Sequence, residues 1–157
     1  MNAVEALKKL FENIIFLSAA SSLCTAQLIK ILIYMLNNRR KKIHDLFETA
    51  LWRTGGMPSS HSAVVCSLTT SVGFNEGISS NLFVFCLVFA LVVLRDALGV
   101  RRAAGLQAKA LNDLGKQCAV KTGIDFHAVK EIQGHTPLEV LVGVFLGIFI
   151  AAGFALL

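Results

Sequence analysis

The sequence lacks any C-x-x-C pair, although it contains four cysteines. Paired cysteines at short spacing are typical of zinc sites, and closely set cysteines in short secreted chains indicate a disulfide framework. Here the cysteines lie singly, and three of them fall within apolar runs. We therefore expect buried free thiols and no metal site. These residues are Cys24, Cys66, Cys86 and Cys118.

Acidic residues are also scarce, with 10 Asp and Glu against 15 Lys and Arg, which leaves a net charge of +5. A basic cluster such as "NNRRKK" at 37–42 can neutralise phosphates in a nucleic-acid binder. No aromatic or helical nucleic-acid motif accompanies it, so we expect no nucleic-acid partner. In a membrane protein the same cluster marks the cytoplasmic side.

Apolar residues, by contrast, make up 55% of the 157 residues, more than an ordinary globular domain carries. Three apolar runs, at 11–36, 81–98 and 137–157, are near the ~20 residues that a spanning helix requires. A fourth run at 61–74 would reach only ~21 Å, so it either spans the membrane or re-enters it. The sequence predicts an all-α, polytopic membrane helix bundle with about four spans, forming one domain over 1–157.

The positive charges are distributed unevenly between the two sides of such a bundle. With four spans, the loops 37–60 and 99–136 lie on one side and the two termini on the other. Eleven Lys and Arg residues fall in those loops, against Lys8 and Lys9 on the opposite side. The positive-inside rule then makes both loops cytoplasmic. We expect an integral protein of a bacterial-type plasma membrane or of an organelle membrane.

Two further patterns concern single helices. The segment 103–117 separates Ala and Leu from Lys and Asp at helical spacing, which predicts a short amphipathic helix lying on the membrane or on the bundle. The last span carries Gly143 and Gly147, followed by Ala151. A stripe of small residues at this spacing indicates close helix packing.

Three polar islands interrupt the apolar pattern, and all lie at the same membrane face in the four-span arrangement. They are "RTGGMPSSHS" at 53–62, "RDALGVRRAAG" at 95–105 and "QGHTPLEV" at 133–140.

The first island has the pattern of a loop followed by a helix start. Glycines such as Gly56 permit unusual backbone angles, and the pair Ser59 and Ser60 supplies a cap. The N–H groups at such a start attract anions, so we expect these three residues to contact a phosphate. The alternative is a turn and an N-cap without a ligand.

Two histidines, His61 and His135, each open an apolar run beside glycine, proline and hydroxyl residues. A histidine pair at one face suits phosphoryl transfer, because one imidazole can attack phosphorus while the other protonates the leaving oxygen. Arginine presents forked donors that match phosphate oxygens. We therefore expect Arg53, Arg101 and Arg102 to hold the anion.

Glu139 follows His135 by four residues, where it can orient the imidazole by accepting its N–H. The pattern Thr136-x-x-Glu139, with Pro137 at the first helical position, is equally a capping box. The two roles are compatible, and both stay open.

A cation, Lys30, lies within the first span, three residues after Gln27 and on the same face. It either faces a polar cavity in the bundle or extends toward the membrane surface. Asp96 either supports the anion site or pairs with Arg95 or Arg101. We count Gln27 and Asp96 as supporting residues.

The three islands together resemble the divergent branch of the type 2 phosphatidic acid phosphatase superfamily, which is related to acid phosphatases and vanadium-dependent haloperoxidases. The segments that carry the resemblance are "GGMPSSHSA", "DALGVRRAAGLQA" and "GHTPLEVLVG". The resemblance covers about residues 27–157. It implies a helical membrane fold with a metal-free phosphatase site.

The superfamily's P-S-G-H motif is matched by Pro58, Ser59, Ser60 and His61, with serine in place of glycine. The resemblance implies that Ser59 binds phosphate and that His61 is the general acid. His135 matches the later histidine of the S-R-x5-H-x3-D motif.

The match to that later motif implies that His135 is the nucleophile and forms a phosphohistidine, with Glu139 in the place of the orienting aspartate. Lys30 and Arg53 resemble the earlier cations, without the usual close spacing. The Ser-Arg pair expected before His135 is absent, since Ala128 and Val129 stand there.

We therefore predict an integral-membrane phosphatase that acts on a lipid phosphate or diphosphate. The resemblance implies no cofactor, with vanadate or tungstate as phosphate mimics. The expected partners are a phosphorylated substrate and membrane lipids, and the sequence leaves a homo-oligomer open. The alternatives are a non-catalytic protein that binds anionic lipid in the same cationic pocket, a transporter or channel, and a haloperoxidase.

Overall fold

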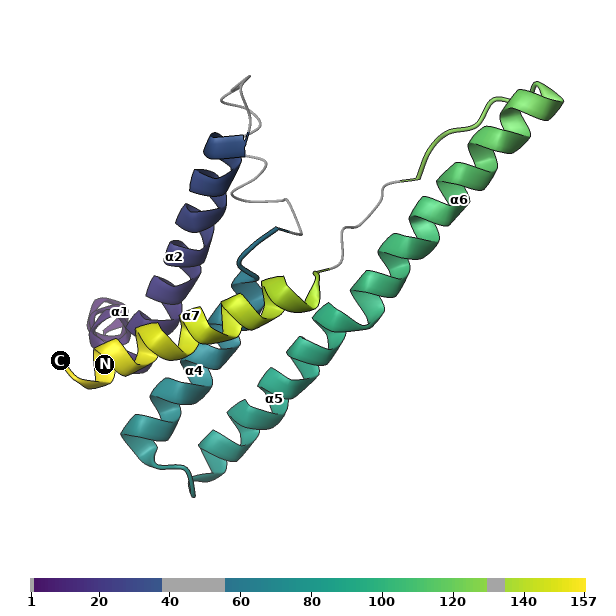
Figure 1. The fold of residues 1–157 in the computed structure, drawn as a ribbon. Helices are drawn as coiled ribbons and strands as arrows, with labels where there is room; N and C mark the ends of the chain where they lie inside the picture. The colour runs from purple at the N-terminus through teal and green to yellow at the C-terminus, as the bar shows by residue number, and fades with distance from the viewer. Residues whose placement is uncertain (1, 38–55, 130–134) are drawn as a thin grey trace.

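The computed structural model describes residues 2–37, 56–129 and 135–157, and no strand occurs in these ranges. The described residues form helices joined by short connections (Figure 1), which confirms the predicted all-α fold. The helices are α1 (Ala3–Glu12), α2 (Ile14–Asn37), α4 (Ser60–Glu76), α5 (Asn81–Leu98), α6 (Val100–Thr122) and α7 (Pro137–Ala155).

The first apolar run is divided between two helices. The side chain of Asn13 accepts hydrogen bonds from the backbone N–H groups of Ile15 and Phe16, at 2.9 and 3.1 Å. These bonds satisfy donors at the start of α2 that would otherwise lack partners. The first long apolar helix therefore begins at Ile14, three residues after the start of the run predicted at 11–36.

The helix α4 occupies the interior of the bundle and packs against α7, α2 and α5 (Figure 1). It is rich in small residues, and nine of its side chains are buried. Its sequence is less apolar than that of its neighbours, because those neighbours, rather than lipid, surround it. Its buried residues are Ser60, Ser62, Ala63, Val65, Cys66, Ser67, Thr69, Ser71 and Val72.

Judged by length and composition, three helical stretches in the described ranges can cross a membrane: Ile14–Leu36, Asn81–Thr122 and Pro137–Ala155. The 17 residues of α4 would extend ~26 Å at 1.5 Å per residue. A tight connection around Gly77 and Ser80 joins α4 to α5, and the two helices pack side by side in opposite directions (Figure 1). This hairpin favours the crossing alternative for the run at 61–74 and agrees with about four spans.

The predicted stripe of small residues on α7 is the surface that meets α4. Gly143, Gly147 and Ala151 are all buried. A Cβ atom added at Gly143 would overlap the carbonyl oxygen of Ser59, and one at Gly147 would overlap that of Ala63. The prediction of close helix packing is confirmed, because only glycine lets the two backbones approach this closely.

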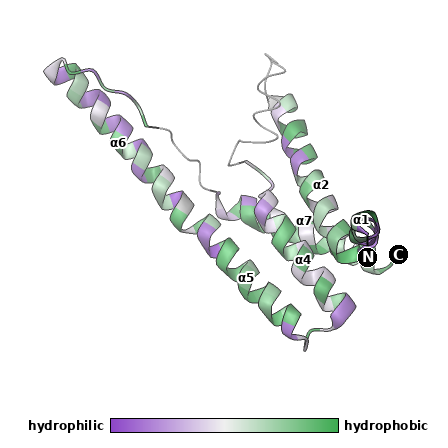
Figure 2. Cartoon of the chain, turned by 180° about the vertical axis from the view of Figure 1, so that it is seen from behind, coloured by the Kyte–Doolittle hydropathy of each residue, from purple (hydrophilic) through white to green (hydrophobic). Residues whose placement is uncertain are grey.

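The amphipathic segment is longer than predicted and extends away from the bundle. The helix α6 covers 100–122 rather than 103–117, and among the described helices it packs only against α5. It nearly continues the axis of α5 beyond Gly99 (Figure 1). The alternative that it lies on the bundle is therefore wrong. Figure 2 shows α5 apolar on most of its surface, whereas polar and apolar residues alternate along α6.

After α6 the chain turns back along the same helix. Gly123 ends α6 with φ +70°, a left-handed conformation that favours glycine. The side chain of Asn112 then makes two hydrogen bonds with the backbone of Val129, at 2.9 and 3.0 Å. These bonds attach the segment 123–129 to α6 ahead of α7.

The close crossing of α4 and α7 predicts that a branched side chain at Gly147 is destabilising. We expect Gly147→Val to lower the free energy of unfolding by about 1–3 kcal/mol through overpacking. Gly153→Val is the matched control, because it lies on the same helix and a Cβ there meets nothing within 4 Å. Thermal unfolding in detergent, followed by circular dichroism, measures both. Equal losses in the two variants would contradict the packing argument.

Candidate active site at the starts of helices α4 and α7

The start of α4 is capped as the first polar island predicts. The Oγ atom of Ser59 accepts hydrogen bonds from the backbone N–H of Ser62 at 3.4 Å and from its hydroxyl at 2.9 Å. The backbone N–H of Ser59 donates to the carbonyl oxygen of Glu139 at 2.9 Å. Gly56 precedes this cap with φ +87°, a conformation that other residues rarely adopt. The first and third islands are therefore in direct contact.

The start of α7 contains the predicted capping box. The Oγ1 atom of Thr136 accepts from the backbone N–H of Glu139 at 3.4 Å, and Glu139 Oε2 accepts from the backbone N–H of Thr136 at 3.0 Å. The same Oε2 atom lies 3.2 Å from Nδ1 of His135. Glu139 therefore has both of the roles that its spacing left open, capping the helix and contacting the imidazole.

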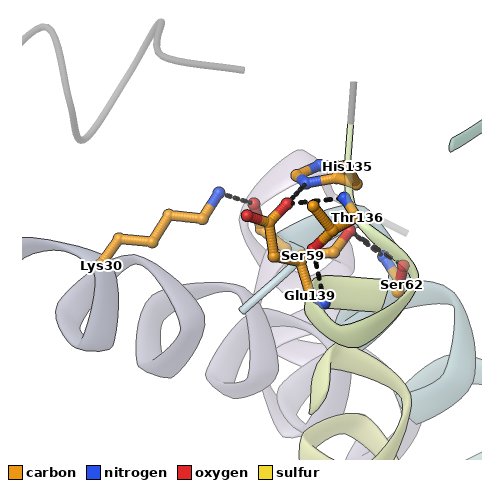
Figure 3. A network of polar contacts seen from close by, with 7 residues as sticks. Lys30, Ser59, Ser62, His135, Thr136 and Glu139 are labelled. Atoms are coloured by element: carbon orange, nitrogen blue, oxygen red, sulfur yellow. Dashed lines mark hydrogen bonds and ion pairs between the residues drawn. The ribbon is translucent and has the colours of Figure 1, made fainter. Parts of the chain in front are cut away.

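Lys30 faces the interior of the bundle. Its side chain is only 7% exposed, and its Nζ donates a hydrogen bond to Oγ of Ser60 at 3.0 Å. The carboxylate of Glu139 lies near this ammonium group (Figure 3). The alternative that Lys30 extends to the membrane surface is wrong, because the hydroxyl of Ser60 and the nearby carboxylate supply partners within the bundle.

Three helices thus bring their polar groups to one place (Figure 3). The ammonium group of Lys30 comes from α2, the hydroxyl groups of Ser59 and Ser60 from the start of α4, and the pair His135 and Glu139 from the start of α7. His135 is 4% exposed. The arrangement combines a cation, hydroxyl donors, the positive end of a helix dipole and an imidazole oriented by a carboxylate. Such a set can bind an anion and transfer a proton or a phosphoryl group.

The remaining predicted residues are not all brought to this cluster. His61 is exposed in the first turn of α4, directly between the buried Ser60 and Ser62. Gln27 lies one turn before Lys30, and its buried Oε1 has no hydrogen-bond partner among the described residues. Asp96 is half-buried near the end of α5.

The structure describes the side chain of one of the three arginines that were predicted to hold the anion. Arg102 is exposed on α6, which packs against α5 alone among the described helices, so the described contacts do not bring it to the cluster. Arg101 belongs to α6, but its side chain lies outside the described part, and Arg53 lies outside the described residues altogether.

One participant was missed by the sequence reasoning. Ser62 bonds to Ser59 through both its backbone and its hydroxyl, and its position three residues after the cap was the available signal. The bond from Ser59 N–H to the backbone of Glu139 had no local signal, because it joins residues 80 positions apart. Within the described ranges, no group of three or more His, Cys, Asp or Glu side chains could hold a metal ion.

Comparison with known sequences shows the family of this chain. A family described as "Divergent PAP2 family" matches residues 11–150. The chain belongs to this family. The match includes the residues of the cluster on α2, α4 and α7, so the resemblance carried by the polar islands is confirmed at the level of the family.

The chain is also similar to a curated protein of Bacillus subtilis (strain 168), described as "Uncharacterized membrane protein YuiD". The two are 37% identical over an alignment of 153 positions, and the alignment covers 90% of this chain and 94% of the relative. This similarity agrees with an integral membrane protein. No solved structure matches the chain.

The buried bond between Lys30 and Ser60 predicts an energetic coupling that thermal unfolding can measure. Ser60→Ala leaves the ammonium group without its hydroxyl acceptor, so we expect it to cost about 1–3 kcal/mol. In a Lys30→Met background, where no buried cation needs a partner, the same change should cost about 1 kcal/mol less. Lys9→Met, at an exposed position of α1, is the matched background. Additive effects in both backgrounds would exclude the coupling.

Proposed function

We propose that this protein is an integral-membrane phosphatase that releases phosphate from a lipid phosphate or diphosphate. The observation that carries the proposal is the contact between His135 Nδ1 and Glu139 Oε2, at a cluster that also contains a buried cation and a helix start. Membership of the Divergent PAP2 family supports the same chemistry.

The contact with Glu139 favours the proton on Nδ1 of His135, which leaves the Nε2 lone pair free to attack. In the first step a bond forms between Nε2 and phosphorus, and the bond from phosphorus to the leaving oxygen breaks. His61 donates a proton to that oxygen. In the second step a water oxygen forms a bond to phosphorus while His61 accepts a proton from that water, and the bond from phosphorus to Nε2 breaks, which releases phosphate and restores the lone pair on His135.

The phosphate oxygens require cationic and N–H donors in this scheme. The hydrogen bond between Lys30 and Ser60 at the start of α4 supports a role for both as phosphate ligands, and the positive end of the α4 dipole favours an anion there. Arg53, Arg101 and Arg102 are proposed as further ligands. No cofactor is required, and vanadate or tungstate should occupy the phosphate position.

The location of the cluster supports a lipid substrate. The helices α2 and α7, which carry Lys30 and His135, are both long and apolar enough to cross a membrane. A phosphate on a membrane lipid is therefore within reach of the site, whereas the attached chain can stay among the exposed apolar side chains of these helices.

A second candidate function is the binding of an anionic lipid without turnover. It is favoured by the absence of the Ser-Arg pair before His135, where Ala128 and Val129 stand. Both functions use the same cationic groups, so affinity alone does not separate them. A measurement of phosphate release separates the two functions.

We place the site on the cytoplasmic side, on the basis of the positive charges in the loops 37–60 and 99–136. Cys118, which is exposed on α6, provides the test. In a variant without the other three cysteines, a membrane-impermeant maleimide should label Cys118 of sealed, right-side-out vesicles only after they are opened. Labelling of intact vesicles would reverse the assignment.

His135→Ala should abolish phosphate release, because it removes the nucleophile. We expect a loss of at least about 10³-fold in kcat, together with loss of the acid-labile phosphoenzyme. His127→Ala is the control, because His127 is an exposed histidine in the segment attached to α6. The measurement uses a lipid phosphate in detergent micelles. Activity that survives the change at His135 would remove the phosphohistidine mechanism.

The two roles of Glu139 can be separated by a pair of variants. Glu139→Gln keeps a side chain that can complete the capping box but removes the carboxylate beside His135, so kcat should fall about 10²-fold or more with little change in stability. Thr136→Ala should lower the free energy of unfolding by about 1 kcal/mol and leave kcat nearly unchanged. Parallel changes of kcat and stability in both variants would show that Glu139 acts only as a cap.

A further inference from the structure

A groove runs along the junction of α5 and α6, two helices that carry none of Lys30, Ser60, His61, His135 and Glu139. Its volume is about 880 Å³, within the ~300–1,000 Å³ of sites that bind small molecules. Its wall is formed by the leucines at 91, 94 and 98, by Gly99, and by Val100 and Ala103 of α6. Among the side chains that the structure describes, Arg95 is the charged one that lines it.

The sequence around Gly99 explains the groove. Leu91, Leu94 and Leu98 recur at intervals of three and four residues, so they share one face of α5 with Arg95. Beyond Gly99, α6 extends away and packs against no described helix except α5. This face is therefore uncovered by the described residues.

Arg95 has no carboxylate partner within the described residues. Its neighbour Asp96 points about 100° away around the helix. Arg95 lies in the last turn of α5, where the helix dipole favours a cation. The dipole, however, favours a cation on any side of that turn, and it does not explain why this one stands between Leu94 and Leu98 in the groove.

We propose that this groove binds an anionic phospholipid of the surrounding membrane. The acyl chain lies along the leucines, and the phosphate of the head group contacts the guanidinium of Arg95, whose forked donors match phosphate oxygens. Because α5 is long and apolar enough to cross the membrane and Arg95 is in its last turn, the proposal puts Leu91 and Leu94 in the hydrocarbon and Arg95 at the head groups. Leu98 lies beyond the arginine, beside the head group.

The charges favour an anionic lipid over a second copy of this chain. The segment 95–109 contains Arg95, Arg101, Arg102 and Lys109 against a single acid, Asp96. A second copy in the groove would bring two such segments together, with like charges in a poorly solvated place. A phosphate group instead supplies the missing negative charge.

The proposal does not depend on the proposed catalysis. It uses none of the residues Lys30, Ser60, His61, His135 and Glu139. A phosphatidylglycerol probe carries a phosphodiester, so its retention can be measured in the His135→Ala variant without turnover. Loss of phosphatase activity and loss of this lipid are thus separate results.

The test is native mass spectrometry of the full chain in detergent, titrated with phosphatidylglycerol or with phosphatidylcholine of the same acyl chains. We expect one retained lipid per chain and a preference of roughly fivefold for phosphatidylglycerol. Arg95→Gln should remove the preference, and Leu98→Trp, which fills the groove, should weaken the retention of both lipids. Leu91→Trp is a second groove-filling variant in case Leu98→Trp does not fold.

The matched controls are Lys116→Gln and Leu106→Trp, which make the same changes at exposed positions of α6 outside the groove. Both should retain lipid as the unaltered chain does. Equal retention of the two lipids, or equal effects of Arg95→Gln and Lys116→Gln, would overturn the proposal. A mass of two chains without bound lipid would assign the groove to a second copy.

Discussion

The close approach of α4 and α7 is the constraint on which the rest of this structure depends. The backbone of α7 at Gly143 and Gly147 lies against the carbonyl oxygens of Ser59 and Ala63, and no side chain fits between them. In a membrane there is little hydrophobic drive to bring helices together, so contact at this distance and backbone hydrogen bonding must supply the stability. The bond from Ser59 N–H to the carbonyl of Glu139 then places the starts of the two helices side by side.

That placement lets a small number of polar groups lie in a largely apolar bundle. The ammonium group of Lys30 has the hydroxyl of Ser60 as its acceptor, and the carboxylate of Glu139 contacts both a backbone N–H and His135. Each of these groups would be costly to bury alone. Because they lie within one cluster, the groups that stabilise the start of α7 are also those that orient the imidazole.

The two ends of α5 show how the same membrane environment shapes surfaces outside the cluster. Toward Ser80 the helix pairs with α4 in a tight hairpin, whereas toward Leu98 it leaves the bundle and continues into α6. The apolar side chains near this second end remain uncovered by the described residues and lie beside the cation Arg95. In our proposal an anionic lipid covers this surface, with its hydrocarbon and its head group matched to different parts of one helix.

The sequence by itself determined the features that depend on short separations along the chain. Helical spans follow from runs of apolar residues, the cap at Ser59 and the box at Thr136 follow from residues three positions apart, and the stripe beginning at Gly143 follows from helical periodicity. Each of these is decided by hydrogen bonds within a turn or by the pitch of one helix. For that reason we could predict the approximate number of spans, the family and the caps within the polar islands.

Only the tertiary structure decided which of these groups meet. Nothing local to Lys30 distinguishes a cation that extends to the surface from one that faces the interior, because the choice depends on Ser60, 30 residues later. Likewise, the pattern in α6 shows an apolar face but not what covers it, and the helix proved to extend away from the bundle with Arg102 exposed. These outcomes depend on how whole helices pack, and packing is set by contacts between residues far apart in the chain.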